Sequence, residues 1–314
     1  MTASVEEIIA ALREVSPDLL RWSGAVARKM RTFNVALSGK ESGNANTDAL
    51  TLADLTVQEL VVAGLRDRAP LLRQCRIEAE EENGDLQAFA SESPLVIALD
   101  PIDGTKYFKD RIGNAYAVML HLRNKTQVLY SLVYSPEQGP SGTWTQAFGK
   151  TIKCGPDDLT CSAGECLERM SPVDFNDRPD SSKIYVIGFQ KNDPFVAEEI
   201  TRAGLQGFAP DDMPTSIYPL MATGEFAGSL IHTPNIYDYP VSHQLARQLG
   251  GDSVWVHNGQ SVNFSTTWMD HRADMLRLPG IVATADSSEK LRILIDLAHD
   301  WSQDRYGGKL KEAD

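Results

Sequence analysis

The feature that most constrains the fold is a short, continuous run of apolar residues that ends at an acid. Residues 95–99 read Leu-Val-Ile-Ala-Leu and are followed at once by Asp100. A run of this length without polar alternation is typical of a strand that is covered on both faces. We therefore expect a sheet buried between other layers, with Asp100 at the end of one of its strands.

Length, charge and composition limit the classes of protein to consider. The chain has 314 residues with 42% hydrophobic content, enough for one large core or two lobes. Its formal net charge of −13 argues against binding a nucleic acid polymer, because phosphate backbones attract clustered Lys and Arg.

No segment approaches the ~20 apolar residues of a membrane span, so we expect a cytoplasmic protein with no membrane partner. The four cysteines lack zinc-ligand spacing and predict free thiols.

The N-terminal segment predicts two helices in succession. The first should begin after a capping-box pair, Ser4 and Glu7, and end near Val15. Residues 16–18 read Ser-Pro-Asp, which supplies a cap, a proline at the first helical position and an early acid, and so predicts a second helix from there to residue 33. The apolar face of this second helix should carry Leu19, Trp22, Val26, Met30 and Phe33.

The middle of the chain predicts one more helix and a hairpin. Small polar residues at 39–46 predict a mobile loop, and a helix should run from Asp54 to Ala69. Residues 115–122 and 126–134 read as two strands of a hairpin. Residues 136–182 carry no clear periodicity and predict surface loops.

After residue 182 strand-like and helix-like segments alternate, which is typical of an α/β fold. We expect one lobe over residues 1–180 and a second over residues 181–314. The predicted strands are 184–189, 226–231, 253–257 and 281–285, and the predicted helices are 194–203, 217–222, 239–249 and a last one from about 288.

The segment from Asp100 to Thr105 reads Asp-Pro-Ile-Asp-Gly-Thr and carries the strongest chemical signal. Pro101 and Gly104 predict a tight turn that points both aspartates into one small space. Two like charges that close would not both stay ionised without a cation between them. Hard oxygen ligands are what Mg²⁺ requires, so the segment predicts a magnesium site; an ordinary Asp-Gly turn is the alternative.

Two further acidic positions could complete such a site. Residues 79–82 read Ala-Glu-Glu-Glu and could present one or two carboxylates, although an acidic run is usually a solvated loop. Asp238 comes directly before a predicted helix, where aspartate normally serves as an N-cap. For each of these two positions considered alone, both interpretations stay open: a ligand of the metal site or an ordinary structural role.

Four segments together resemble the inositol monophosphatase family of metal-dependent phosphatases. Thr51 to Asp54 is similar to the family's Thr-x-Ala-Asp element, and Ala79-Glu80-Glu81 to its Gly-Glu-Glu. Asp100 to Thr105 reproduces its Asp-Pro-Ile-Asp-Gly-Thr, and Tyr237-Asp238 through Gly251 resembles its Trp-Asp and Gly-Gly segment. The resemblance implies an α/β fold of two lobes, layered α-β-α-β-α, with the active site between the lobes.

The resemblance also implies a role for each site residue. Two or three Mg²⁺ ions would be held by Glu80, Asp100, the carbonyl of Ile102, Asp103 and Asp238. Thr105 and Asp54 would orient a water for in-line attack on phosphorus, with Glu80 as a third catalytic residue. The substrate would be bound by Gly104, Thr105, Lys106 and Asp238. The partner would be a small phosphorylated metabolite, and a homodimer is compatible with the family.

The departures from the family pattern leave two questions open: which substrate is used, and which two glutamates correspond to the family's Glu-Glu pair. Glu81-Glu82 could replace Glu80-Glu81 as the acidic pair. Ile231 stands where relatives acting on inositol phosphates carry an acid, whereas Lys106 and Tyr116 look more like the branch that acts on 3′(2′),5′-bisphosphate nucleotides. Histidinol phosphatases share that lysine. An inactive member that binds phosphorylated metabolites as a regulator is the alternative from another class.

Overall fold

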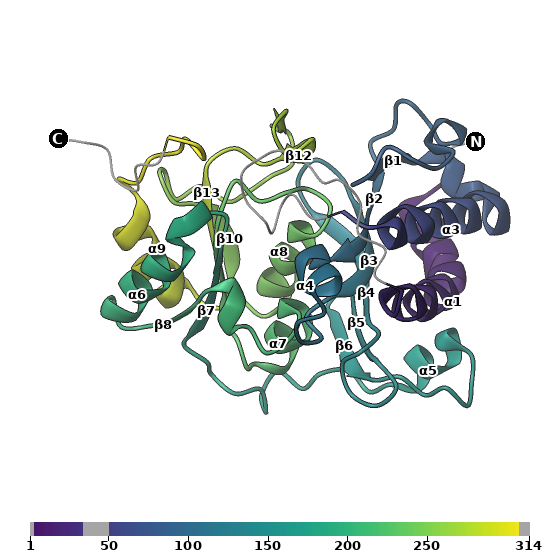
Figure 1. Ribbon diagram of the computed structural model, residues 1–314, viewed down its shortest axis with the longest axis horizontal. Coiled ribbons are helices and arrows are strands. Elements are labelled where there is room, and N and C mark those ends of the chain that lie inside the picture. The colour runs from purple at the N-terminus through teal and green to yellow at the C-terminus, as the bar shows by residue number, and fades with distance from the viewer. Residues whose placement is uncertain (1–2, 34–49, 308–314) are drawn as a thin grey trace.

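Two sheets and three layers of helices alternate through the computed structural model, which describes residues 3–33 and 50–307. Helices α1 and α3 cover the outer face of the first sheet, α4, α7 and α8 lie between the two sheets, and α6 and α9 cover the second (Figure 1). This α-β-α-β-α order confirms the predicted fold class. The predicted division at residues 180 and 181 stays a prediction.

The first sheet has six strands in the order β1-β2-β3-β4-β5-β6. β1 and β2 are parallel and every other neighbouring pair is antiparallel. Val96 to Leu99 are all buried, as the apolar run predicted. The strand bounds are β1 Arg76–Ala79, β2 Val96–Asp103, β3 Ala117–Arg123, β4 Val128–Ser135, β5 Thr143–Phe148 and β6 Thr151–Pro156.

The predicted pair of helices at the N-terminus is one helix, α1 (Val5–Arg31), so the predicted break at Pro17 is wrong. Pro17 is buried inside the helix, and the hydroxyl of the preceding Ser16 donates to the Leu12 carbonyl at 2.6 Å. A proline removes one backbone donor. Burial of one continuous stripe on both sides of Pro17 keeps the helix unbroken: Leu12, Val15, Leu19, Leu20, Ser23 and Ala27.

That stripe also corrects the predicted apolar face. Leu19 is buried as predicted, but Trp22 is 52% exposed because the helix buries Leu20 and Ser23 instead. Phe33 is 65% exposed and lies beyond the end of α1. The capping box of Ser4 and Glu7 is present as predicted. The helix predicted from Asp54 to Ala69 is α3 (Leu52–Arg68), whereas the loop predicted at 39–46 lies outside the described residues.

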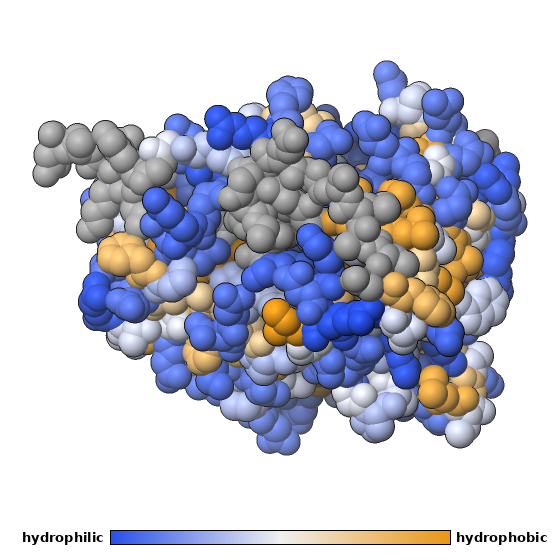
Figure 2. Space-filling model, viewed as in Figure 1, coloured by the Kyte–Doolittle hydropathy of each residue, from blue (hydrophilic) through white to orange (hydrophobic). Residues whose placement is uncertain are grey.

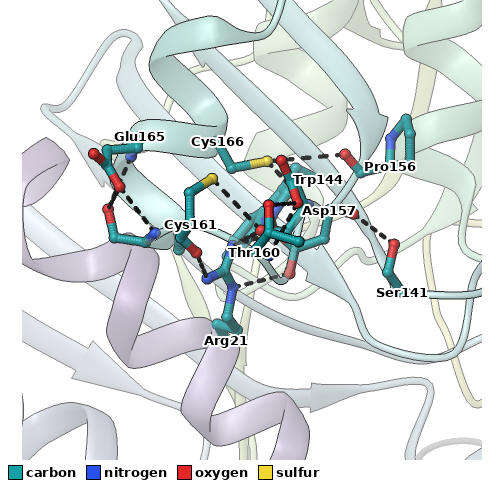
Figure 3. A network of polar contacts seen from close by, with 12 residues as sticks. Arg21, Ser141, Trp144, Pro156, Asp157, Thr160, Cys161, Glu165 and Cys166 are labelled. Carbon is teal, nitrogen blue, oxygen red and sulfur yellow. Dashed lines mark hydrogen bonds and ion pairs between the residues drawn. The ribbon is translucent and has the colours of Figure 1, made fainter.

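Residues 136–182 are not only loops, which is a second correction. They contain β5, β6 and the short helix α5 (Ala163–Arg169). β6 is an edge strand and most of it is partly exposed, so its sequence lacks the apolar run that marks β2. Asp157, just after β6, ties this region to α1 (Figure 3).

The second sheet has five strands in the order β10-β13-β9-β7-β8. Its strands are β7 Lys183–Ile187, β8 Gln206–Phe208, β9 Gly228–His232, β10 Asp252–Trp255 and β13 Ile281–Ala285. A separate hairpin joins β11 (Trp268–Asp270) to β12 (Met275–Arg277). The predicted strands near 184, 226, 253 and 281 are confirmed within a few residues, and β8, β11 and β12 were not predicted.

Helices from the second half of the chain fill the space between the sheets. α7 (Ile217–Thr223) and α8 (Tyr239–Gln248) pack against the first sheet, next to the short α4 (Thr105–Asp110). α6 (Asp193–Arg202) and α9 (Ser288–Ala298) lie on the far side of the second sheet (Figure 1). Short 3-10 helices occupy Pro70–Gln74, Leu86–Ala88, Gln190–Asn192 and Pro210–Asp212.

The face in Figure 2 is mostly hydrophilic, with hydrophobic residues in small separate groups. Over residues 3–33 and 50–307, every helix is too short or too polar to cross a lipid bilayer. The four cysteines are free thiols, as predicted.

Candidate metal centre

A bulge at the end of β2 brings the two aspartates of the Asp-Pro-Ile-Asp segment onto one side. In a regular strand, side chains three residues apart point to opposite faces. β2 pairs with β3 as Asp100↔Met119 and then as Asp103↔Ala117, so one extra residue is inserted between the two pairs. The insertion reverses the alternation, and Asp100 and Asp103 can therefore face the same space.

Gly104 allows the chain to turn directly from β2 into α4. Its φ is +84°, and a Cβ atom there would lie 2.3 Å from the Ala115 carbonyl oxygen. L side chains rarely adopt this conformation, and a backbone carbonyl two residues before β3 cannot easily move away. Glycine at this position thus places Thr105 immediately beside the two aspartates.

Asp238 completes the cluster from the second half of the chain. The side-chain oxygen of Asn235 accepts from the amides of Tyr237 at 2.8 Å and Asp238 at 3.0 Å, which fixes the turn before α8. Asp238 stands at the N-cap position of α8, but its side chain forms no capping hydrogen bond with the helix. Instead, Asp100, Asp103 and Asp238 can each present one oxygen within 4.8 Å of the others.

The electrostatics of the three aspartates fit a divalent cation. Burial, and then the neighbouring carboxylates, raise the pKa of Asp100 and of Asp103 well above the usual range. Burial and Glu80 raise the pKa of Asp238 to about 6. Among the described residues, Asp100 Oδ1 has no hydrogen-bond partner although it is buried. Hard oxygen ligands that repel one another suit Mg²⁺, which would relieve the repulsion.

The acidic run presents Glu80 to this cluster. Glu80 follows β1, which lies parallel to β2, and its amide donates to the Leu99 carbonyl at 3.2 Å. Its side chain lines the pocket that contains the three aspartates. The backbone of Glu81 is held instead by Gln58, which accepts from its amide and donates to its carbonyl. Of the two possible acidic pairs, Glu80-Glu81 is therefore the one whose first glutamate lies in the pocket.

Thr105 and Asp54 meet as the sequence resemblance implied. The Thr105 hydroxyl lies 3.1 Å from Asp54 Oδ1 and 2.8 Å from the Ile102 carbonyl oxygen, and its single proton can be donated to one of them at a time. Asp54 Oδ2 accepts from the amide and the hydroxyl of Thr51. Burial raises the pKa of Asp54 to about 7. A group that titrates near neutral pH can take a proton during catalysis.

The pocket lies between the two sheets and has a volume of about 150 Å³. Lys106 lines it and forms an ion pair of 3.1 Å with Asp211, whose side chain is 82% exposed. The wall residues that were not predicted from the sequence include Tyr218, whose hydroxyl bonds to Asp103, and the buried Arg277 and Arg305. No local pattern marks them, because each reaches the pocket from a different element.

Comparisons with known proteins show the family to which the chain belongs. Residues 11–269 match the model of the inositol monophosphatase family, so the chain belongs to that family. A search of curated protein sequences finds no match.

Several solved structures share the fold. An inositol monophosphatase from Anabaena (Nostoc) sp. PCC 7120 is 16% identical with a TM-score of 0.61, over 92% of this chain and 97% of that one. CysQ from Bacteroides thetaiotaomicron is 18% identical with a TM-score of 0.57, over 90% and 98%. An inositol monophosphatase/NADP phosphatase complexed with Mg²⁺ and phosphate is 14% identical with a TM-score of 0.59, over 93% and 95%. Identities this low establish the fold alone.

Proposed function

We propose that the protein is a Mg²⁺-dependent phosphatase that hydrolyses a small phosphomonoester. The observation that carries this proposal is the cluster of Asp100, Asp103 and Asp238 beside the contact between Thr105 and Asp54. Family membership and the relative complexed with Mg²⁺ and phosphate support it. We further propose that two or three ions bind, held by Glu80, Asp100, the Ile102 carbonyl, Asp103 and Asp238.

The residues of the chain suggest how the reaction proceeds. Bound Mg²⁺ would polarise the phosphate oxygens, activate a water and neutralise the leaving oxygen. Thr105 would hold the attacking water in line with the bond to be broken, and Asp54 would take its proton through the Thr105 hydroxyl. The phosphorus–oxygen bond to the alcohol breaks, the alcohol oxygen gains a proton, and the products are an alcohol and inorganic phosphate. The amides of Gly104 and Thr105, at the start of α4, would bind phosphate oxygens.

For the substrate we lean towards 3′(2′),5′-bisphosphate nucleotides over inositol phosphates or histidinol phosphate. Ile231, where the sequence comparison expects an acid for inositol phosphates, lines the pocket and offers no hydrogen bond to a sugar hydroxyl. Lys106 also lines it and could approach a second phosphate if its exposed pair with Asp211 opened. The structural neighbour named as an inositol monophosphatase/NADP phosphatase is compatible with a nucleotide substrate.

Phosphate release from a substrate panel tests the proposal. The panel contains inositol phosphates, 3′-phosphoadenosine 5′-phosphate, histidinol phosphate and fructose 1,6-bisphosphate, each with Mg²⁺ or EDTA. We expect Mg²⁺-dependent release that Asp103→Asn abolishes and that Asp110→Asn, at an exposed aspartate of α4 outside the pocket, retains. Folded protein that turns over no member of the panel would favour the alternative of an inactive metabolite-binding protein.

A further inference from the structure

The wall of the pocket beside Asp238 contains a buried arginine on the β11–β12 hairpin. Arg277, at the end of β12, is 4% exposed and lines the same pocket as Asp103 and Asp238. Arg305 lies beside it and is equally buried. Both arginines come after residue 269, where the match to the family model ends, so the common family pattern does not account for them.

Backbone pairing fixes Arg277 next to the turn that carries Asp238. The amide of Ile236 donates to the Leu276 carbonyl at 3.1 Å, and the amide of Leu278 donates to the Pro234 carbonyl at 2.8 Å. Asn235 and Arg277 form the β-bridge between these two bonds. Arg277 is close enough to lower the pKa of Asp238. Its position relative to the acidic cluster is therefore set by the fold and not by a flexible side chain.

The guanidinium of Arg277 has one anionic contact, one backbone carbonyl acceptor and one weak acceptor. Its Nε donates to Asp270 Oδ2 at 2.9 Å, but that carboxylate oxygen also accepts from the Tyr306 hydroxyl at 2.7 Å and lies 3.9 Å from Arg305 Nε. In the described part of the chain, the acceptor of Arg277 Nη2 is the thioether of Met275, at 3.0 Å. Sulfur in a thioether accepts hydrogen bonds poorly. A buried guanidinium in this setting gains from a second anion.

Thr233, between the two arginines, has the backbone conformation of a constrained site. It is a β-branched residue at φ +48°, its carbonyl accepts from Arg277 Nη1 at 3.1 Å, and its hydroxyl accepts from Arg305 Nη1 at 2.9 Å. Such backbone geometry is costly and persists where surrounding contacts fix it, often at ligand sites. Thr233 also lines the pocket.

We propose that Arg277, with Arg305 adding positive charge behind it, binds a second anionic group of the substrate, a phosphate or a carboxylate, while the acidic cluster takes the phosphate to be cleaved. This inference rests on the proposed function, and it names the substrate class: a phosphomonoester with a second anion. It assigns the larger part of the recognition of that anion to Arg277, because the cation of Lys106 is paired with the exposed Asp211.

The test compares selectivity, which does not depend on how much of each protein folds. If the second anion is a phosphate, its recognition is measured by dividing kcat/KM for 3′-phosphoadenosine 5′-phosphate by kcat/KM for adenosine 3′-monophosphate. If the second anion is a carboxylate, its recognition is measured by dividing kcat/KM for phosphoglycolate by kcat/KM for phosphoethanol. A charge-assisted hydrogen bond contributes about 10- to 100-fold in binding, so Arg277→Gln should lower one of these ratios by about that factor, and Arg277→Lys by less.

The matched control is Arg123→Gln. Arg123 is a buried arginine paired with Glu78 and lies outside the pocket, so its loss should leave both ratios within about twofold. If Arg277→Gln also leaves both ratios within that range, or if the natural chain prefers the substrates that lack the second anionic group, the inference is wrong even though the phosphatase function holds.

Binding separates failure of the inference from failure of the proposed function. Calorimetric titration of 3′-phosphoadenosine 5′-phosphate, and separately of phosphoglycolate, into Asp103→Asn with Mg²⁺ needs no turnover. The double variant that combines Asp103→Asn with Arg277→Gln should bind one of the two ligands with a Kd about tenfold or more higher than Asp103→Asn alone. The double variant with Arg123→Gln should bind both ligands with unchanged Kd. This result would support the anion site even if no substrate is hydrolysed. Unchanged Kd values for both ligands would leave Arg277 with a structural role only.

Discussion

Two regions of the molecule bury aspartate, and their surroundings differ. Asp157 accepts from Arg21 Nε at 2.9 Å and from the Trp144 indole at 2.8 Å (Figure 3). It also accepts from the Tyr134 hydroxyl at 3.2 Å. Asp100, Asp103 and Asp238 instead face one another, and their pKa values are raised. A buried acid surrounded by donors holds the fold together, whereas acids that face one another are a favourable ligand set for a divalent cation.

The largest expected effect follows from removing one member of the acidic cluster. Asp103→Asn should lower kcat/KM for Mg²⁺-dependent phosphate release by about 10³-fold or more, because a metal ligand and its charge are lost. The same change should raise the Tm of the metal-free protein, because it removes repulsion between buried carboxylates. Phosphate-release kinetics and thermal melts in EDTA measure the two effects. A variant that loses both activity and metal-free stability would contradict the distinction between the two regions.

Asp157→Asn should give the opposite combination. Breaking a buried ion pair typically costs about 3–5 kcal/mol, and because the Arg21 side chain is 15% exposed we expect the low end of that range. Activity per folded molecule should be retained, because Asp157 lies outside the pocket. Urea unfolding followed by tryptophan fluorescence measures the loss, with Asp158→Asn, at the exposed neighbouring aspartate, as the control.

The pH dependence of stability should carry the signature of the acidic cluster. The pKa of Asp238 is about 6 and that of Asp54 about 7 in the folded protein, against about 3.9 for aspartate in the unfolded chain. Between these values the folded state binds more protons than the unfolded state, so the metal-free protein should lose stability as pH rises from about 4 to about 7.

Thermal melts between pH 5 and pH 8, with and without Mg²⁺, measure this trend. Mg²⁺ should raise the Tm more at pH 8 than at pH 5, since protonated carboxylates bind metal poorly. Asp103→Asn should flatten the metal-free profile and Asp157→Asn should retain its slope. A Tm shift by Mg²⁺ that is equal at both pH values would argue that the ion does not bind these acids.

The smallest effect is expected from Lys106→Met. Its ion pair with the exposed Asp211 contributes about 0–1 kcal/mol, so stability should hardly change. If Arg277 binds the second anion, kcat/KM for 3′-phosphoadenosine 5′-phosphate should fall less than about fivefold, below the effect of Arg277→Gln. A larger loss in Lys106→Met than in Arg277→Gln would reverse that assignment.

Much of the fold and part of the site could be predicted from the sequence. The buried run at Val96 to Leu99 and the segment from Asp100 to Thr105 are local signals, and they lie where they were expected. The longer strands and helices after residue 182 were also predicted within a few residues, but the three-residue strands β8, β11 and β12 were not. Such elements are specified by residues that are adjacent along the chain.

The rest depends on contacts between distant residues. Pro17 reads locally as a helix start, but the continuous buried stripe of α1 overrides that signal. The bulge between Asp100 and Asp103 exists only in the pairing of β2 with β3, so no spacing rule revealed why both acids face one side. Arg277 reaches the pocket because β12 pairs with the turn before α8, which is a contact across about forty residues.

The layer between the two sheets has a consequence for synthesis of the chain on the ribosome. One apolar cluster joins Met119, Val133 and Ile152 of the first sheet to Met221 of α7 and Leu245 of α8. When residues 1–180 have emerged, that face of the sheet still lacks its cover, because α7 and α8 have not been translated. A nascent chain of this length would expose an apolar sheet surface and is a natural client for a chaperone until the second half appears.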